Sequence, residues 1–319
     1  MQWRKIGKIF DPRDYKLISG LNEFAQSPQA LVFEDFVRVY FSTRSRDVGS
    51  SNFVSHIAFA DFDKSFSTVK RVSDHTVLAL GGVGSFDEHG VFPMNVLRHD
   101  GKILGYTSGV NRRTAVPVDT AIGAVVSKDQ GETFQRQRVG PVLSASLHEP
   151  FLVADPFVQV FDGVFHMWYI FGLGWKRFSD QAAPDRIYKI AHATSKDGIH
   201  WAKNDGVQVV ASTLGAEECQ ALPTVIKIGT RYHMYFCYRY ADNFRTDPRR
   251  GYRIGHAVSD DLLRWERDDE SVGIDKSPSG WDSQMMCYPH VFQVESRILM
   301  LYNGNEFGRH GFGLAELEL

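Results

Sequence analysis

Carboxylates recur at one position along the chain, shortly before each of five evenly spaced prolines. Every one of these prolines has an acid five to seven residues ahead of it, in the set Glu23, Asp87, Glu88, Glu149, Glu217, Glu218 and Asp282. If these segments meet at one mouth, several acids face one another across a pocket. Glycoside hydrolysis needs such an arrangement, with one protonated acid beside the leaving oxygen and one ionised partner across the sugar ring. The acids therefore predict a pocket that acts on saccharides.

Cations, amides and histidines are predicted to share this mouth. The chain carries Arg44, Arg112, Trp175, Arg239 and Asn303 just past five recurring tyrosines, and His89, His148 and His290 close to the prolines. Arginines at rigid strand ends bind planar carboxylates or phosphates through two hydrogen bonds, so an anionic glycan or sugar nucleotide is one predicted ligand. Structural pairing of the arginines with neighbouring acids is the alternative. Trp175 follows a Gly-Leu-Gly segment and is the predicted sugar-stacking residue.

A repeat organises these segments. Its prolines are separated by 65, 63, 67 and 66 residues, and they are Pro28, Pro93, Pro156, Pro223 and Pro289. A tyrosine follows each proline by 12 or 13 residues, in the set Tyr40, Tyr106, Tyr169, Tyr235 and Tyr302. A third segment alternates with small residues, at 57–60, 122–125, 190–193, 254–257 and 312–315, and a fourth closes most repeats around Phe134, Trp201 or Trp265. Four strands in each of five repeats predict an all-β fold, a five-bladed β-propeller.

The two ends of the chain are predicted to complete one blade together. Four residues follow 312–315, so the last repeat lacks a fourth strand of its own. Residues 2–9 look like the fourth segment around Trp201, with Trp3 in the place of that tryptophan. We therefore expect Trp3 in the outer strand of the final blade, and residues 1–319 as a single propeller domain.

The recurring acids also have a structural interpretation. In propellers, a carboxylate near the start of an inner strand often binds backbone amides of the neighbouring loop. Because each blade repeats the same device, structural repetition would produce an acid in all five segments. The sequence leaves the catalytic and the structural interpretation open.

Bulk properties narrow the class of partner. The net charge is −2, from 36 basic and 38 acidic residues, which argues against a nucleic-acid surface. The sequence shows no long apolar run and no secretory pattern, so we expect no membrane association and a cytoplasmic protein. No metal-binding spacing occurs, and we predict no cofactor, although carboxylates lining a central channel could hold a structural ion such as calcium.

Nearly the whole chain resembles glycoside hydrolases of family 43 and related five-bladed propeller glycosidases of the family 32 type. Residues 154–163, ADPFVQVFDG, are similar to that family's third-blade segment, and the resemblance implies that Asp155 orients the substrate and tunes the pKa of the other acids. Residues 217–223, EECQALP, are similar to the segment that holds the general acid, which implies Glu218 in that role, with Glu217 as the alternative. The family's base is an aspartate directly before the first proline, where this chain has Ser27. Glu23 or Asp87 would have to replace it, or hydrolysis is absent.

The chain also resembles uncharacterised propeller proteins associated with bacterial surface-polysaccharide gene clusters. The residues that carry this resemblance are 252–257 (YRIGHA), 273–278 (GIDKSP), 280–283 (GWDS), 287–291 (CYPHV) and 301–305 (LYNGN). In addition, residues 127–134, SKDQGETF, resemble the Asp-box turn of sialidases, which supports propeller architecture and lies far from catalysis in that fold.

Two classes of function follow. The first is a glycosidase-like enzyme acting on an oligosaccharide or polysaccharide, with Glu218 as acid, Asp155 as modulator and Asp87 or Glu23 as base. The second is a carbohydrate-binding or accessory protein of surface-glycan biosynthesis that kept the pocket and lost the base. Ser27 favours the second class, and the number of acids favours the first.

Overall fold

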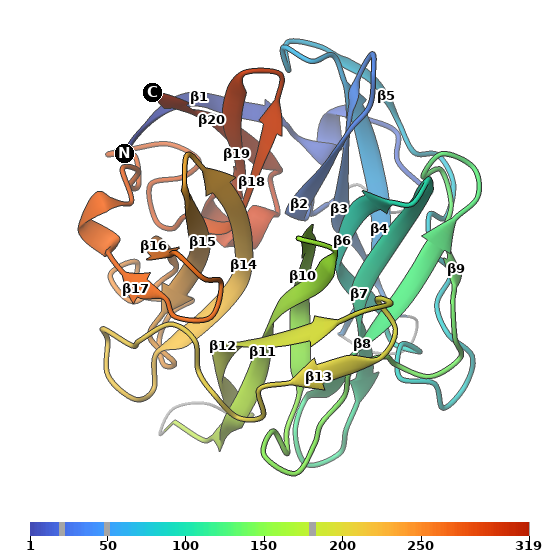
Figure 1. Ribbon diagram of the computed structural model, residues 1–319, viewed down its shortest axis with the longest axis vertical. Helices are drawn as coiled ribbons and strands as arrows, with labels where there is room; N and C mark the ends of the chain where they lie inside the picture. Colours follow the sequence, from blue (N-terminus) through green and yellow to red (C-terminus); the bar gives the residue numbers. More distant parts are fainter. Residues whose placement is uncertain (19–22, 48–51, 179–182, 319) are drawn as a thin grey trace.

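The chain folds into five four-stranded antiparallel sheets around a ring, in sequence order (Figure 1). The computed structural model describes residues 1–18, 23–47, 52–178 and 183–318. Helix in these ranges is confined to three short 3-10 turns, η1 (Pro12–Asp14), η2 (Asp269–Ser271) and η3 (Asn305–Gly308). None of them has the length and apolar character needed to cross a membrane. The prediction of an all-β, five-bladed β-propeller is confirmed.

Each blade runs from an inner strand at the hub to an outer strand at the rim (Figure 1). Blade one contains β2 (Gln26–Val32), β3 (Val37–Arg46), β4 (Phe53–Phe62) and β5 (Val69–Val72). Blade two contains β6 (Val91–His99), β7 (Lys102–Arg112), β8 (Val118–Ser127) and β9 (Gln135–Arg136). Blade three contains β10 (Val153–Phe161), β11 (Val164–Lys176), β12 (Asp185–Ser195) and β13 (Trp201–Lys203). Blade four contains β14 (Cys219–Ile228), β15 (Arg231–Arg239), β16 (Arg253–Ser259) and β17 (Glu266–Arg267). Blade five contains β18 (Cys287–Val294), β19 (Arg297–Asn303), β20 (Phe312–Glu318) and β1 (Gln2–Phe10).

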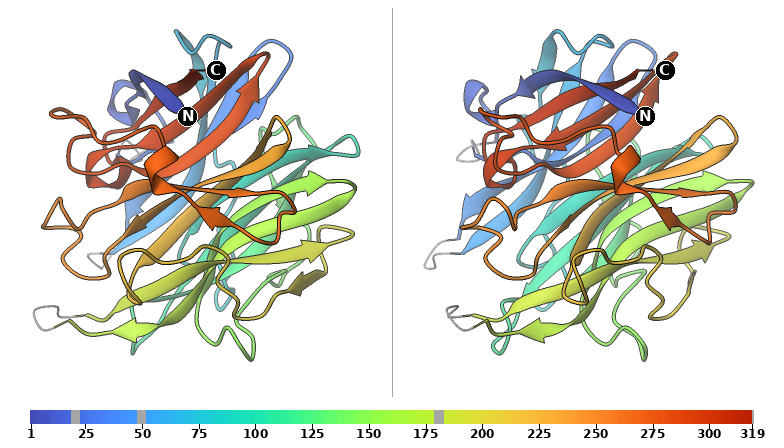
Figure 2. Two further views of the ribbon diagram at one scale, coloured as in Figure 1. Left: turned by 60° about the vertical axis from the view of Figure 1, so that its left-hand side comes forward. Right: turned by 90° about the vertical axis from the view of Figure 1, so that its left-hand side faces the viewer.

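The first strand of the chain closes the ring by completing the last blade. Strand β1 pairs antiparallel with β20, and Trp3 lies opposite Leu317. Trp3 is 3% exposed and its ring meets Tyr235 of blade four edge to face at 5.4 Å. Figure 2 shows both termini beside this sheet. The predicted exchange of termini is confirmed, and β1 supplies the fourth strand of the last blade.

Small residues in the third strands make room for aromatic rings from the loop before the inner strand of the same blade. A Cβ added to Gly123 would lie 2.7 Å from the Phe86 ring, and one added to Gly313 would lie 2.5 Å from the Trp281 ring. Both distances are shorter than van der Waals contact, so only glycine fits at these positions. The alternation of small residues in the sequence therefore reflects close packing within the blades.

Adjacent blades are joined by the recurring tyrosines and by turns of the Asp-box type. Tyr40 of blade one donates its hydroxyl to the carbonyl of Gly131 in the blade-two turn, at 2.8 Å. The turn is shaped by its own side chains, because Ser127 Oγ accepts from the Gly131 N–H at 2.8 Å and Asp129 accepts from the Thr133 N–H at 2.9 Å. Tyr106 makes the equivalent contact with the next blade, at the carbonyl of Gly198. The resemblance of residues 127–134 to the Asp-box thus corresponds to a structural turn.

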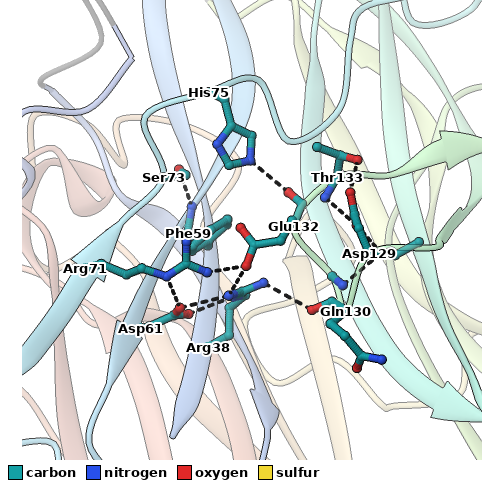
Figure 3. Close-up of polar contacts among 12 residues, drawn as sticks. Arg38, Phe59, Asp61, Arg71, Ser73, His75, Asp129, Gln130, Glu132 and Thr133 are labelled. Atoms are coloured by element: carbon teal, nitrogen blue, oxygen red, sulfur yellow. Dashed lines mark hydrogen bonds and ion pairs between the residues drawn. The ribbon is translucent and has the colours of Figure 1, made fainter.

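A buried ion cluster strengthens the same junction between blades one and two (Figure 3). Arg38 is 1% exposed and donates two hydrogen bonds to Asp61, at 2.7 and 2.8 Å. It also reaches Glu132 of blade two at 2.8 Å, while Arg71 donates to Asp61 at 2.8 Å. In this cluster every buried charge has an opposite partner, which is what makes a buried ion pair tolerable in a protein interior.

Candidate functional site

Every inner strand breaks its register at the recurring proline. The residue before the proline has a positive φ in four blades, with values of 52°, 54°, 44° and 59° at Ser27, Asp155, Leu222 and Tyr288. A β-bulge of this kind re-aims a side chain, here toward the hub. The ring centroids of Phe92 and Tyr288 lie 6.4 Å apart, and both Tyr288 and the Leu222 backbone lie close enough to Asp155 to interact with it. The pre-proline residues of blades two to five therefore meet.

Asp155 is the carboxylate that a bulge places at the hub. The residue is 7% exposed, and its backbone N–H donates to Ser108 Oγ at 2.8 Å. Burial raises the pKa of the Asp155 carboxyl to about 6, against smaller lowering effects of the Arg186 guanidinium and the Leu222 N–H. Among the described residues, no second carboxylate contributes to this shift. Asp155 therefore changes protonation state close to neutral pH, which suits a general acid.

Arg44, near the end of β3, brings a positive charge to the same hub. It has no ion pair within the described ranges, and its buried Nε has no hydrogen-bond partner. Its guanidinium lies over aromatic rings instead, 4.9 Å from Phe24 and 5.8 Å from Phe92. Burial lowers the pKa of Arg44, and the charges of Arg186 and Arg245 lower it further. Guanidinium groups from blades one, three and four thus lie near one another.

Arg239, at the end of β15, is 2% exposed, and among the described residues it too forms no ion pair with an acid. It donates to the carbonyl of Tyr240 at 2.8 Å and to Tyr188 Oη at 3.0 Å. Burial raises the pKa of Tyr188 to about 12, so this phenol is neutral. The guanidinium also lies 3.4 Å from the centre of the Phe244 ring. Neutral oxygens and aromatic faces, rather than a carboxylate, accommodate its charge.

A cavity of about 460 Å³ opens beside these residues. It is lined by Pro117, Trp175, Ala183, Pro184, Asp185, Arg186, Asn243, Phe244, Arg245 and Thr246. The Arg245 guanidinium lies 4.1 Å from the centre of the Phe244 ring and pairs with Asp185 at 3.1 Å. We call Asp155 with Arg44, Arg186, Arg239 and Arg245 the arginine funnel; of these residues, Arg186 and Arg245 line the cavity. The volume suits a small saccharide, and Trp175 supplies an aromatic face at the wall.

Four of the predicted acids form buried ion pairs with outer strands instead of facing the hub. Glu149 pairs with Lys203 at 2.6 Å, Glu218 with Arg267 at 2.6 Å and Asp282 with Lys5 at 2.7 Å, and Asp87 pairs with Arg136. These acids are at most 2% exposed. Each cation lies two residues after the outer-strand aromatic, in the order Trp201, Trp265, Trp3 and Phe134. The repetition shows a structural device that fastens the rim strand of a blade to the loop before its inner strand.

Glu218 illustrates how this pairing acts on a carboxyl group. Burial acts to raise its pKa, but the hydrogen bond from Gln220 and the charge of Arg267 outweigh burial and lower it. The backbone N–H groups of Thr213 and Leu214 also donate to it, each at 2.8 Å. The pKa of Glu218 is therefore lowered by its partners, whereas burial raises the pKa of Asp155 to about 6.

Three further predicted residues lie in partly exposed ion pairs. Glu23 pairs with Arg309 at 3.1 Å, and its side chain is 41% exposed. Glu217 pairs with Lys176, and Arg112 pairs with Asp47. Arg112 lines a separate cavity of about 430 Å³ with Phe86, Asn111, Arg113 and Asp119 among its neighbours. These residues are not brought into contact with Asp155.

The remaining predicted residues are dispersed. His148 is exposed and His89 half-buried, both in loops that precede inner strands. His290 is buried beside a third cavity of about 470 Å³, lined by the later halves of all five inner strands, and burial lowers its pKa to about 3. Asn303 accepts from the Ser27 N–H at 2.7 Å and donates to the carbonyl of Ala25 at 2.8 Å, which ties blade five to blade one.

The funnel contains residues that the sequence reasoning missed, above all Arg186 and Arg245. Arg186 is the second residue of β12, a third strand of its blade. Third strands start at the face where inner strands start and second strands end, so reading their first residues would have found it. Arg245 lies in the loop after β15, where spacing carries no signal. Within the described residues, no three His, Cys, Asp or Glu side chains group closely enough to hold a metal ion.

The fold is shared with carbohydrate-active enzymes. A solved structure of a glycoside hydrolase matches with a TM-score of 0.74 and 16% identity, over 99% of this chain and 92% of that one. A thermostable family-43 glycoside hydrolase matches with a TM-score of 0.65 and 15% identity, over 95% and 92%. Beta-1,2-mannobiose phosphorylase from Listeria innocua matches with a TM-score of 0.68 and 12% identity, over 100% and 97%. The chain is a five-bladed β-propeller of the kind adopted by these enzymes.

Relatives in sequence define the family more narrowly. No known protein-family profile matches the chain. Two Mycobacterium tuberculosis proteins, "Uncharacterized protein MT1551" (strain CDC 1551 / Oshkosh) and "Uncharacterized protein Rv1502" (strain ATCC 25618 / H37Rv), are each 35% identical to it over 324 residues, covering 100% of both sequences. The chain belongs to the family of these two proteins.

Proposed function

We propose that the chain binds an anionic saccharide in the arginine funnel and cleaves a glycosidic bond with Asp155 as the general acid. The observation that carries this proposal is the carboxyl of Asp155, which the pre-proline bulge places at the hub and whose pKa burial raises to about 6. A protonated carboxyl can give its proton to the leaving oxygen of a glycosidic bond near neutral pH.

The surroundings of Asp155 support a charged sugar as the ligand. Arg44 and Arg186 have no acid bonded to them within the described ranges, so their donors are available to a carboxylate or phosphate on a saccharide. Trp175 offers a stacking face in the cavity of about 460 Å³ that Arg186 and Arg245 also line. The fold agrees, since its neighbours act on glycosidic bonds with water or, in the phosphorylase, with phosphate.

Asp155 takes the role in this proposal that the family resemblance gave to Glu218. The ion pair of Glu218 with Arg267 keeps that carboxyl ionised and fully buried, so it holds no proton to donate at neutral pH. Asp87 is 2% exposed and paired with Arg136, so its carboxylate is not open to a substrate or to an attacking water. Ser27 keeps open a second function, that of a carbohydrate-binding or accessory protein, because blade one presents no carboxylate at its bulge.

The Asp155→Asn variant tests the proposal against a panel of aryl glycosides and acidic oligosaccharides. We expect wild-type protein to bind and cleave a member of the panel, and the variant to bind that member with similar affinity without cleaving it. Binding without cleavage by the wild-type protein would support the accessory function. Equal cleavage by both proteins would refute the role of Asp155.

A further inference from the structure

The arginine funnel has an excess of positive charge. It combines four guanidinium groups with the carboxyl of Asp155. Among the described residues, Asp185 is the only further acid that forms an ion pair with one of these four arginines. The chain as a whole has a net charge of −2, so this excess is local. Arg239 is buried and Arg44 half-buried, and each has a buried Nε without a hydrogen-bond partner. A buried guanidinium without an anion is unfavourable, and such a group is retained where a ligand supplies the missing charge.

The funnel also has too few acids for hydrolysis. Both hydrolytic geometries use two carboxyl groups, one as acid and the other as base or nucleophile. Asp155 supplies the first, and no second carboxylate of the described chain interacts with it. The acids that could have served as base are occupied: Asp87 by Arg136, Glu23 by Arg309 and Asp185, in the cavity wall, by Arg245. A nucleophile that already carries negative charge needs no base to activate it.

We propose that the arginine funnel binds inorganic phosphate and that this phosphate, rather than water, attacks the anomeric carbon, so that the chain is a glycoside phosphorylase. The inference rests on the proposed function and names its co-substrate. Planar guanidinium groups bind phosphate oxygens through paired hydrogen bonds, and several of them together match a doubly charged anion better than the single charge of one sugar carboxylate.

The reaction is balanced without any further reagent. One phosphate oxygen forms a bond to the anomeric carbon while the glycosidic carbon–oxygen bond breaks, and the leaving oxygen takes the proton of Asp155. Monohydrogen phosphate returns its own proton to Asp155. The products are a glycosyl phosphate and a shortened saccharide with a free hydroxyl group. In the reverse direction a glycosyl phosphate and an acceptor sugar release inorganic phosphate.

Calorimetric titration with inorganic phosphate is the first test, because it needs no knowledge of the sugar. We expect one phosphate per chain, and binding weaker by at least about tenfold in Arg44→Met. Arg231→Met is the matched control, since Arg231 lies at the opposite end of β15, is paired with Asp260 and should leave phosphate binding unchanged. Absence of binding at millimolar phosphate, or equal affinity in wild type and Arg44→Met, overturns the inference. Circular dichroism checks that both variants are folded.

Product analysis is the second test and separates this inference from the proposed function. We expect cleavage to require phosphate and phosphorus NMR to show a glycosyl phosphate, both lost in Asp155→Asn. Reducing sugars formed at equal rates with and without phosphate would overturn the phosphorylase while the role of Asp155 stands. An acidic oligosaccharide that binds while phosphate does not would assign the arginines to the sugar's own charge and overturn the inference. Cleavage that persists in Asp155→Asn would refute the proposed function itself.

Discussion

Four buried acids are paired with basic residues of the outer strands, and we call them the rim pairs: Glu149–Lys203, Glu218–Arg267, Asp282–Lys5 and Asp87–Arg136. The rim pairs and the arginine funnel both combine acids with basic residues, but their charges are balanced differently. At the rim, Glu218 and Arg267 are both almost fully buried and lie 2.6 Å apart, so each charge satisfies the other. In the funnel, Asp155 and Arg44 are also withdrawn from water, but Arg44 has no acid bonded to it within the described ranges. The rim pair stabilises the fold, whereas the funnel leaves positive charge that an anionic ligand can neutralise.

The comparison shows that burial of a charged residue does not reveal its role. The rim pairs recur in four blades at equivalent positions, as expected of a device that each blade needs in order to hold its outer strand. Asp155 has no such counterpart, because the equivalent residues are Ser27, Phe92, Leu222 and Tyr288. Departure from the repeat, more than charge or burial, identifies the site.

The largest expected effect comes from removing the proton of the funnel acid. Asp155→Asn should lower the rate of glycoside cleavage by about 10²–10⁴-fold, the usual contribution of a general acid. Substrate binding should change little, since the amide keeps the size of the carboxyl. Steady-state kinetics should therefore show the loss in kcat rather than in KM.

The matched variant at the rim is Glu218→Gln, the same amide replacement in a paired acid. It should leave kcat within a few-fold of wild type, because Glu218 does not reach the substrate in the proposed function. A loss of kcat as large as that of Asp155→Asn would move the acid back to Glu218, as the family resemblance implied.

The same variant should have the second-largest effect, on stability. Glu218→Gln removes the fully buried partner of Arg267, whose side chain is 3% exposed, and leaves only its ion pair with Asp269 at 2.8 Å. We therefore expect a loss of about 2 kcal/mol in the free energy of unfolding. Urea unfolding measures this difference. Glu295→Gln is the control, since Glu295 pairs with Lys64 at 3.2 Å with its side chain 68% exposed, and should cost less than about 1 kcal/mol. Equal losses would contradict a structural role for the rim pair.

The fold could be predicted from sequence because its signals are local and repeated. Prolines, tyrosines and small third-strand residues recur in every blade, and each reflects a requirement of the blade itself, such as the ring that meets Gly123 or Gly313. Ring closure could be predicted because the last repeat lacks a fourth strand and the segment around Trp3 resembles one. Strand β1 does pair with β20.

The site could be predicted only in part, because pairing between distant segments has no local signal. Glu218 and Arg267 lie 49 residues apart, and nothing in the spacing of either shows that they bind each other. The predicted set of site residues stays a prediction, although the structure places Asp155 and Arg44 both near Arg186. That set did not include Arg186, because only the first two strands of each blade were considered.

The next two variants each replace an arginine by methionine, one in a rim pair and one in the arginine funnel. Arg267→Met should destabilise the protein by about 3 kcal/mol, since it leaves Glu218 buried and uncompensated. Arg44→Met should raise the melting temperature slightly, because methionine fills the space between Phe24 and Phe92 without the cost of an unpaired charge. Differential scanning calorimetry in phosphate-free buffer distinguishes the two. Destabilisation by both variants would indicate that Arg44 has a structural partner after all.

The buried carboxyl of Asp155 should also make the stability of the protein depend on pH. Burial raises the pKa of its carboxyl from 3.8 to about 6, so between these values the folded state holds a proton that the unfolded state has released. Stability from this group is therefore full below pH 3.8 and is lost as the pH rises through about 6. Relative to Asp155→Asn, wild-type protein should lose stability across this window in urea unfolding at a series of pH values. Glu218, whose pKa is lowered, should give the opposite sign: Glu218→Gln should lack a stabilisation that wild type loses in acid. If both groups gave the same sign, the contrast between a proton-holding funnel and an ionised rim would fail.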